Sequence, residues 1–141
     1  MRLIMCLIAV FLTLALSARA DSLSAEDEAS FRDVIADQIA AFRADDAARA
    51  YSHAAPVIRQ IFPDAERFMG MVRQAYQPVY RPQSYDFGKA GVSASGRPIQ
   101  RVTIVGPDGL TYEAIYTMER QPDGTWQING CALVRSPDIN A

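Results

Sequence analysis

Apolar residues recur at three- and four-residue steps in the first half of the chain, which is the spacing of one face of an α-helix. The segment opens with Ser24-Ala25-Glu26-Asp27, which resembles a capping box with Asp in place of the usual Glu or Gln. The stripe behind it predicts an amphipathic helix of about five turns. Its members are Phe31, Val34, Ile35, Ile39 and Phe42.

Shorter helical segments follow. Asp45-Asp46 predicts a break and a new N-cap for a helix over 47–54. Pro56 suits the first turn of a helix that runs through Phe62. Pro63-Asp64 begins the last one, and helical periodicity ends at Gln77-Pro78. The pattern therefore predicts three to four helices before the sheet.

Beyond residue 78 the apolar period changes to two, which is the period of a β-strand. Strands are predicted over 85–94, 99–105, 110–119 and 125–134, separated by turns rich in Gly, Pro, Asp and Ser. Gly88 and Gly91 in the first strand predict a bulge or strong curvature. Helices followed by an antiparallel meander indicate an α+β fold, with the helices packed on one face of a curved four-stranded sheet.

In the last strand, a strict alternation counted from Trp126 places Ile128 and Gly130 on one face and Asn129 and Cys131 on the other. Cys131 has no cation or helix N-terminus close in sequence to lower its pKa. We therefore interpret it as a small, unreactive core residue. An intermolecular disulfide with another protein is the alternative.

The N-terminus has the pattern of a secretory signal peptide. Arg2 precedes an apolar run over 3–16, and Ala18-Arg19-Ala20 forms a small-x-small cleavage site. The run is shorter than the roughly 20 residues of a membrane span. We expect cleavage after Ala20, a single domain over 21–141, and a periplasmic or secreted protein with no stable membrane insertion.

Composition excludes several function classes. Of the 14 Lys and Arg residues, Arg2 and Arg19 lie in the leader, so 12 remain against 16 acidic residues and the mature net charge is −4. An acidic chain without a basic block is not expected to bind nucleic acid. One histidine and one mature cysteine predict neither an intrachain disulfide nor a structural zinc site. No phosphate loop or dinucleotide fingerprint is present, so no cofactor is predicted.

Three residues are weak catalytic candidates. His53, the sole histidine, can serve as a general base, although its place near the end of a helix favours an electrostatic role at the helix dipole. Asp46 belongs to an acidic pair, but N-capping explains it more simply. Glu113 lies on the predicted third strand, on the face opposite Tyr112 and Tyr116.

Aromatic residues are the candidate ligand-binding group. If Tyr112 and Tyr116 face the hollow of the sheet, they and Tyr51 line an amphipathic cavity with hydroxyl groups, and Trp126 completes the set. The alternative is that each ring is simply part of the core, because aromatic alternation at period two is typical of a buried face.

The chain resembles a poorly characterised family of exported bacterial proteins, domain-of-unknown-function family 4864, and more broadly the nuclear-transport-factor-2-like superfamily of cone-shaped folds. The matching segments include 38–46, 54–58, 68–76 and 124–130. The resemblance implies a bent sheet wrapped around a long first helix. The superfamily includes isomerases, dehydratases, polyketide cyclases and binding modules, so fold analogy does not choose an activity.

These observations lead us to expect a non-catalytic exported binding module, which takes a small apolar ligand or a partner protein in its cone or on its outer sheet face. The alternative is a small cofactor-independent lyase, isomerase or hydrolase with a carboxylate or His53 as general base. Homodimerisation through the open sheet face is a further expectation.

Overall fold

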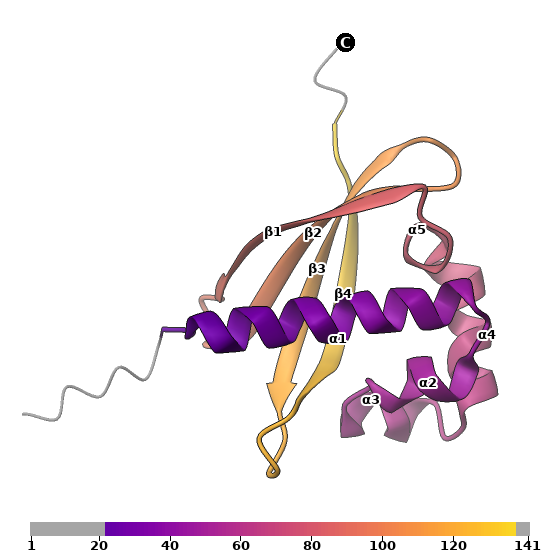
Figure 1. Ribbon diagram of the computed structural model, residues 1–141. Coiled ribbons are helices and arrows are strands. Elements are labelled where there is room, and N and C mark those ends of the chain that lie inside the picture. The colour runs from indigo at the N-terminus through magenta and orange to yellow at the C-terminus, as the bar shows by residue number, and fades with distance from the viewer. Residues whose placement is uncertain (1–21, 138–141) are drawn as a thin grey trace, which may run out of the picture.

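The computed structural model describes residues 22–137, so the predicted signal peptide and its cleavage site lie outside the described residues. Five helices precede a four-stranded sheet, and the strands follow one another as an antiparallel meander in the order β1-β2-β3-β4 (Figure 1). The predicted α+β fold class is confirmed. No helix within residues 22–137 is both long and apolar enough to cross a membrane.

Helix α1 (Ala25–Arg43) lies across the sheet (Figure 1). Its capping box is present: the Ser24 hydroxyl accepts from the Asp27 N–H at 3.0 Å, and the Asp27 carboxylate accepts from the Ser24 N–H at 3.2 Å. Most of the predicted stripe is buried: Phe31, Ile35 and Ile39 have no exposed surface, whereas Val34 is only partly buried. These side chains form the main core with the inner face of the sheet.

Helices α2 (Ala47–Ser52), α3 (Pro56–Ile61) and α4 (Ala65–Ala75) gather at one end of the sheet (Figure 1). Asp46 caps α2 by accepting from the Arg49 N–H at 3.1 Å, and Asp64 caps α4 in the same way at 2.8 Å. The predicted N-cap at Asp46 and the predicted helix start at Pro63-Asp64 are confirmed. A second core cluster, separate from the main one, joins these helices to the end of α1.

Helical structure does not end at Gln77-Pro78, as the periodicity predicted. Helix α5 (Gln77–Tyr80) adds one more turn and buries Pro78 and Val79. A single turn is too short to show a helical period, and a proline in the first turn of a helix loses no hydrogen bond. Residues 22–137 therefore contain five helices, one more than the upper prediction.

The strands are β1 (Ser84–Val92), β2 (Pro98–Val105), β3 (Thr111–Arg120) and β4 (Trp126–Arg135). The predicted bulge in β1 lies between Phe87 and Ala90, where its register with β2 shifts. Gly109 and Gly124 take positive φ angles of 76° and 86° in the two later turns. The curvature of the sheet turns its inner face toward α1 (Figure 1).

A second bulge corrects the predicted faces of β4. Met118 pairs with Ile128 and Thr117 with Gly130, so Asn129 is the extra residue. Beyond this bulge the alternation is reversed, and Cys131 lies directly across from the buried Tyr116. Cys131 therefore shares the inner face with Ile128, whereas strict alternation placed the two on opposite faces.

The link between α2 and α3 is joined to β4 through the backbone. The Ala55 N–H donates to the Ile128 carbonyl at 2.9 Å, and the Ile128 N–H donates to the His53 carbonyl at 2.7 Å. This short parallel bridge fixes the helical end of the molecule against the sheet. It also determines where the His53 side chain and the cavity walls lie.

Candidate functional site

An apolar cavity of about 320 Å³ lies where the helical end meets the sheet. Phe68, Met71 and Val72 of α4 form one wall. Tyr116 and Cys131, paired across β3 and β4, form part of the opposite wall. None of the described residues that line it carries a charged side chain. The cavity is therefore suited to an uncharged and largely apolar occupant.

Three side chains bring hydroxyl or amide groups to this cavity. The Gln38 amide nitrogen donates to the Ala50 carbonyl at 3.1 Å, and the Tyr76 hydroxyl donates to the Cys131 carbonyl at 3.1 Å. The Tyr116 hydroxyl is buried and has no hydrogen-bond partner among the described residues. Only Tyr116, therefore, has a hydroxyl donor not already used by the protein.

Burial sets the protonation states in the cavity wall. It raises the pKa of the Cys131 thiol to about 12 and holds the pKa of the Tyr116 hydroxyl well above 10. The neighbouring thiol further raises the pKa of Tyr116, although the two groups do not have hydrogen-bond geometry. Both groups stay protonated near neutral pH. A partly buried thiol that stays protonated agrees with the interpretation of Cys131 as unreactive.

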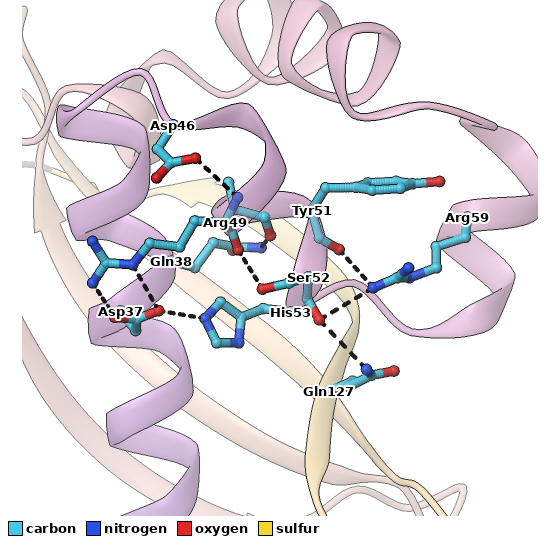
Figure 2. A network of polar contacts seen from close by, with 10 residues as sticks. Asp37, Gln38, Asp46, Arg49, Tyr51, Ser52, His53, Arg59 and Gln127 are labelled. Carbon is cyan, nitrogen blue, oxygen red and sulfur yellow. Dashed lines mark hydrogen bonds and ion pairs between the residues drawn. The ribbon is translucent and has the colours of Figure 1, made fainter.

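A separate polar network surrounds His53 (Figure 2). The His53 Nε2 lies 2.6 Å from the Asp37 Oδ2, and the Arg49 Nε donates to the same carboxylate oxygen at 3.1 Å. A second Arg49 nitrogen bonds to Asp37 Oδ1. These hydrogen bonds, from Arg49 first and from His53 second, lower the pKa of Asp37 to about 2. Asp37 thus orients the imidazole and remains ionised.

The imidazole faces an open cleft of about 480 Å³ that also includes Ser30 and Trp126. A carboxylate-oriented histidine is a familiar arrangement for proton transfer. None of the described residues that line this cleft is a tyrosine, so no tyrosine hydroxyl is placed beside His53 as an acid partner. The other role of His53 is structural, because it is the C-cap of α2 and its carbonyl anchors β4.

Replacing Asp37 by Asn tests the stabilising role of this network. Because the folded-state pKa is lowered, the carboxylate contributes stability fully above its ordinary pKa near 3.8 and loses that contribution as the pH falls to about 2. The carboxylate is 37% exposed, so solvent screening reduces the stability that its ion pairs contribute. We expect Asp37→Asn to lower the melting temperature by about 2 °C at pH 7 and by less at pH 2.5. Equal losses at both pH values would contradict this assignment.

The two carboxylates predicted as weak catalytic candidates have structural partners. Asp46 is the N-cap of α2. Glu113 accepts from the Arg101 guanidinium at 2.7 Å, as an exposed pair on the outer face of β2 and β3. Neither residue lines the apolar cavity or shares the cleft of His53. The structure thus keeps His53, Asp46 and Glu113 apart.

The four predicted ligand-binding aromatics are also dispersed. Tyr116 lines the apolar cavity, whereas the other three do not. Tyr51 packs on Phe68 with ring centroids 5.6 Å apart and donates to the Phe62 carbonyl at 2.5 Å. The Tyr112 hydroxyl donates to Asp108 at 2.6 Å in the turn between β2 and β3. Trp126 lines the cleft of His53.

Several residues of these sites carried no signal that marked them in the sequence. In the sequence, Asp37 is one of several charged residues on the polar side of α1, and its partner His53 lies at the end of another helix. Gln38 lies within the same helix and is only 4% exposed. Met71 lies on α4 and borders the cavity. The one clue in the sequence is that Gln38 lies at helical spacing between Val34 and Phe42, within the apolar stripe.

Residues 24–141 match the family described as Domain of unknown function (DUF4864). No curated protein and no solved structure shows significant similarity to the chain. Among residues 22–137, no group of three or more His, Cys, Asp and Glu side chains is placed to hold a metal ion.

Proposed function

The chain belongs to this family of unknown function, and we propose that it is an exported, non-catalytic binding module whose apolar cavity takes up a small ligand. The observation that carries the proposal is the cavity of about 320 Å³ between α4 and the inner face of β3 and β4. Small-molecule sites have volumes of about 300–1,000 Å³ and mostly apolar walls with a few polar groups. The cavity lies at the lower end of that range.

Two further parts of the proposal concern the fold superfamily and export. The α+β arrangement with a curved sheet around a long first helix supports placement in the nuclear-transport-factor-2-like superfamily. The pattern over residues 1–20 supports export. Mass spectrometry of the chain isolated from its native compartment tests export directly. A mature N-terminus at Asp21 is expected, and a chain that keeps the first 20 residues would contradict it.

Blocking the rim of the cavity tests the binding function. Ala75 is exposed at the end of α4 and borders the cavity. We expect Ala75→Trp to place an indole over the opening and to weaken binding of 2-nonanone, an apolar probe of suitable size, at least about tenfold. Isothermal titration calorimetry gives the affinity, for which we expect a Kd below about 1 mM in the unaltered protein.

The matched control is Ala48→Trp. Ala48 is likewise exposed on a helix, α2, but borders neither the apolar cavity nor the cleft of His53. This variant should bind the probe as the unaltered protein does. Equal weakening in both variants, or no binding by the unaltered protein, would contradict uptake of small apolar ligands in this cavity.

A cofactor-independent acid–base enzyme is the second candidate, and the observation that favours it is the 2.6 Å contact between His53 Nε2 and Asp37. It would act in the open cleft rather than in the apolar cavity, whose described lining includes neither histidine nor carboxylate. A substrate screen comparing the unaltered protein with His53→Gln tests this role. Turnover that disappears in the variant would favour the enzyme over the binding module.

We also propose that a partner protein binds the outer face of the sheet. A second copy of the chain could cover the same face. Analytical ultracentrifugation over a range of concentrations tests self-association, and a monomer at all concentrations would contradict the dimer.

A further inference from the structure

The Tyr116 hydroxyl is an unusual group in this cavity. Tyr116 is only 1% exposed, yet its hydroxyl has no hydrogen-bond partner among the described residues. A buried polar group without a partner is costly, because it has lost its hydrogen bonds to water and gained none in the protein. Gln100 has the other such atom, but Gln100 does not line the cavity.

The neighbouring polar groups do not replace the missing partner. Gln38 and Tyr76 each donate to a backbone carbonyl, and the Cys131 thiol lies directly across the strand pair. A thiol sulfur is only a weak acceptor, and this one does not meet hydrogen-bond geometry with Tyr116. The hydroxyl is thus a free donor in an apolar wall.

We infer that the ligand of this cavity is an uncharged, largely apolar molecule with one hydrogen-bond acceptor oxygen, such as a ketone or an ester, and that the Tyr116 hydroxyl donates to that oxygen. This inference rests on the proposed binding function. The hydroxyl oxygen itself is shielded from solvent, so the ligand reaches it by shifting the side chains beside it. Cys131 is a small side chain at that point of the wall.

The uncharged lining and the volume of the cavity limit the charge and the size of the ligand. A carboxylate or an ammonium group would enter a lining without any charged partner, which disfavours an ionised ligand. If each non-hydrogen atom takes about the 30 Å³ of a water molecule in the liquid, the cavity holds about ten such atoms. The raised pKa of Tyr116 keeps its proton in place for donation at neutral pH.

Three probes of matched length separate these requirements. 2-Nonanone carries an acceptor oxygen, nonane carries none, and octanoate is charged at pH 8. We expect 2-nonanone to bind the unaltered protein about tenfold more tightly than nonane, which corresponds to one hydrogen bond, and octanoate to bind more weakly than 2-nonanone. Titration calorimetry or the ligand-induced rise in melting temperature measures each affinity.

The decisive variant is Tyr116→Phe, which removes only the hydroxyl. It should bind nonane at least as tightly as the unaltered protein but lose the preference for 2-nonanone, and its melting temperature should not fall. Tyr112→Phe is the matched control, because the Tyr112 hydroxyl is bound to Asp108 outside the cavity. This control should keep the preference.

The outcomes distinguish the role of the Tyr116 hydroxyl from the proposed binding function of the cavity. If nonane and 2-nonanone bind equally, or if Tyr116→Phe keeps the preference, the cavity binds apolar molecules but the role of the hydroxyl is overturned. Binding of octanoate as tight as that of 2-nonanone overturns the requirement for an uncharged ligand. If none of the three probes binds the unaltered protein, the proposed function fails as well.

Discussion

Phe31→Ala is expected to lower the free energy of unfolding by about 3–5 kcal/mol, which is a large share of the stability of a typical domain. The Phe31 ring is fully buried between α1 and the sheet. It meets the Trp126 ring edge to face, with the ring centroids 4.8 Å apart and the planes at 88°. The loss therefore combines a cavity in the core with a lost aromatic pair. Urea denaturation followed by far-UV circular dichroism measures it.

Phe87→Ala is the matched control for this prediction. Phe87 lies on β1, is only partly buried and meets the Tyr85 ring at a centroid distance of 5.8 Å. The same chemical change should cost about 1 kcal/mol there, because less surface is lost from the core. A loss at Phe31 no larger than the loss at Phe87 would mean that α1 does not anchor the sheet.

The fold was largely predictable because its elements carry strong local signals. The apolar stripe of α1, the N-caps at Asp46 and Asp64, and the glycine-rich turns each specify a local structure. Helix α5 was missed because one turn cannot show a period. The face of Cys131 was missed because the bulge at Asn129 adds one residue to β4, which reverses every later position.

The candidate sites were much less predictable because they combine residues from distant elements. Asp37 and His53 are 16 positions apart, and only the turn between α1 and α2 brings them to 2.6 Å. Tyr116 lies on the inner face of β3, which was the condition for its predicted role, but an alternating pattern does not reveal whether its hydroxyl finds a partner. That property depends on the side chains that other elements pack around it, among them Val79 of α5 and Cys131 of β4.

Met69→Ala is expected to lower the free energy of unfolding by about 2–5 kcal/mol. Met69 is fully buried in the second core cluster, which joins α4 to α2 and to the end of α1. Its neighbours on α4, Phe68 and Val72, line the apolar cavity. The variant should therefore loosen a wall of the cavity as well as destabilise the fold.

Met71→Ala is the control for this second large effect. Met71 lies on the same helix and borders the cavity but is only partly buried, so Met71→Ala should lower the free energy of unfolding by about 1 kcal/mol.

Labelling of the Cys131 thiol measures the loosening of the cavity wall separately. Burial raises the pKa of that thiol to about 12, so labelling near neutral pH reports opening of the cavity wall. At the same free energy of unfolding, Cys131 should be labelled faster in Met69→Ala than in Phe31→Ala, because the Met69 substitution loosens packing next to the cavity. Equal labelling rates would show that the thiol reacts only through global unfolding.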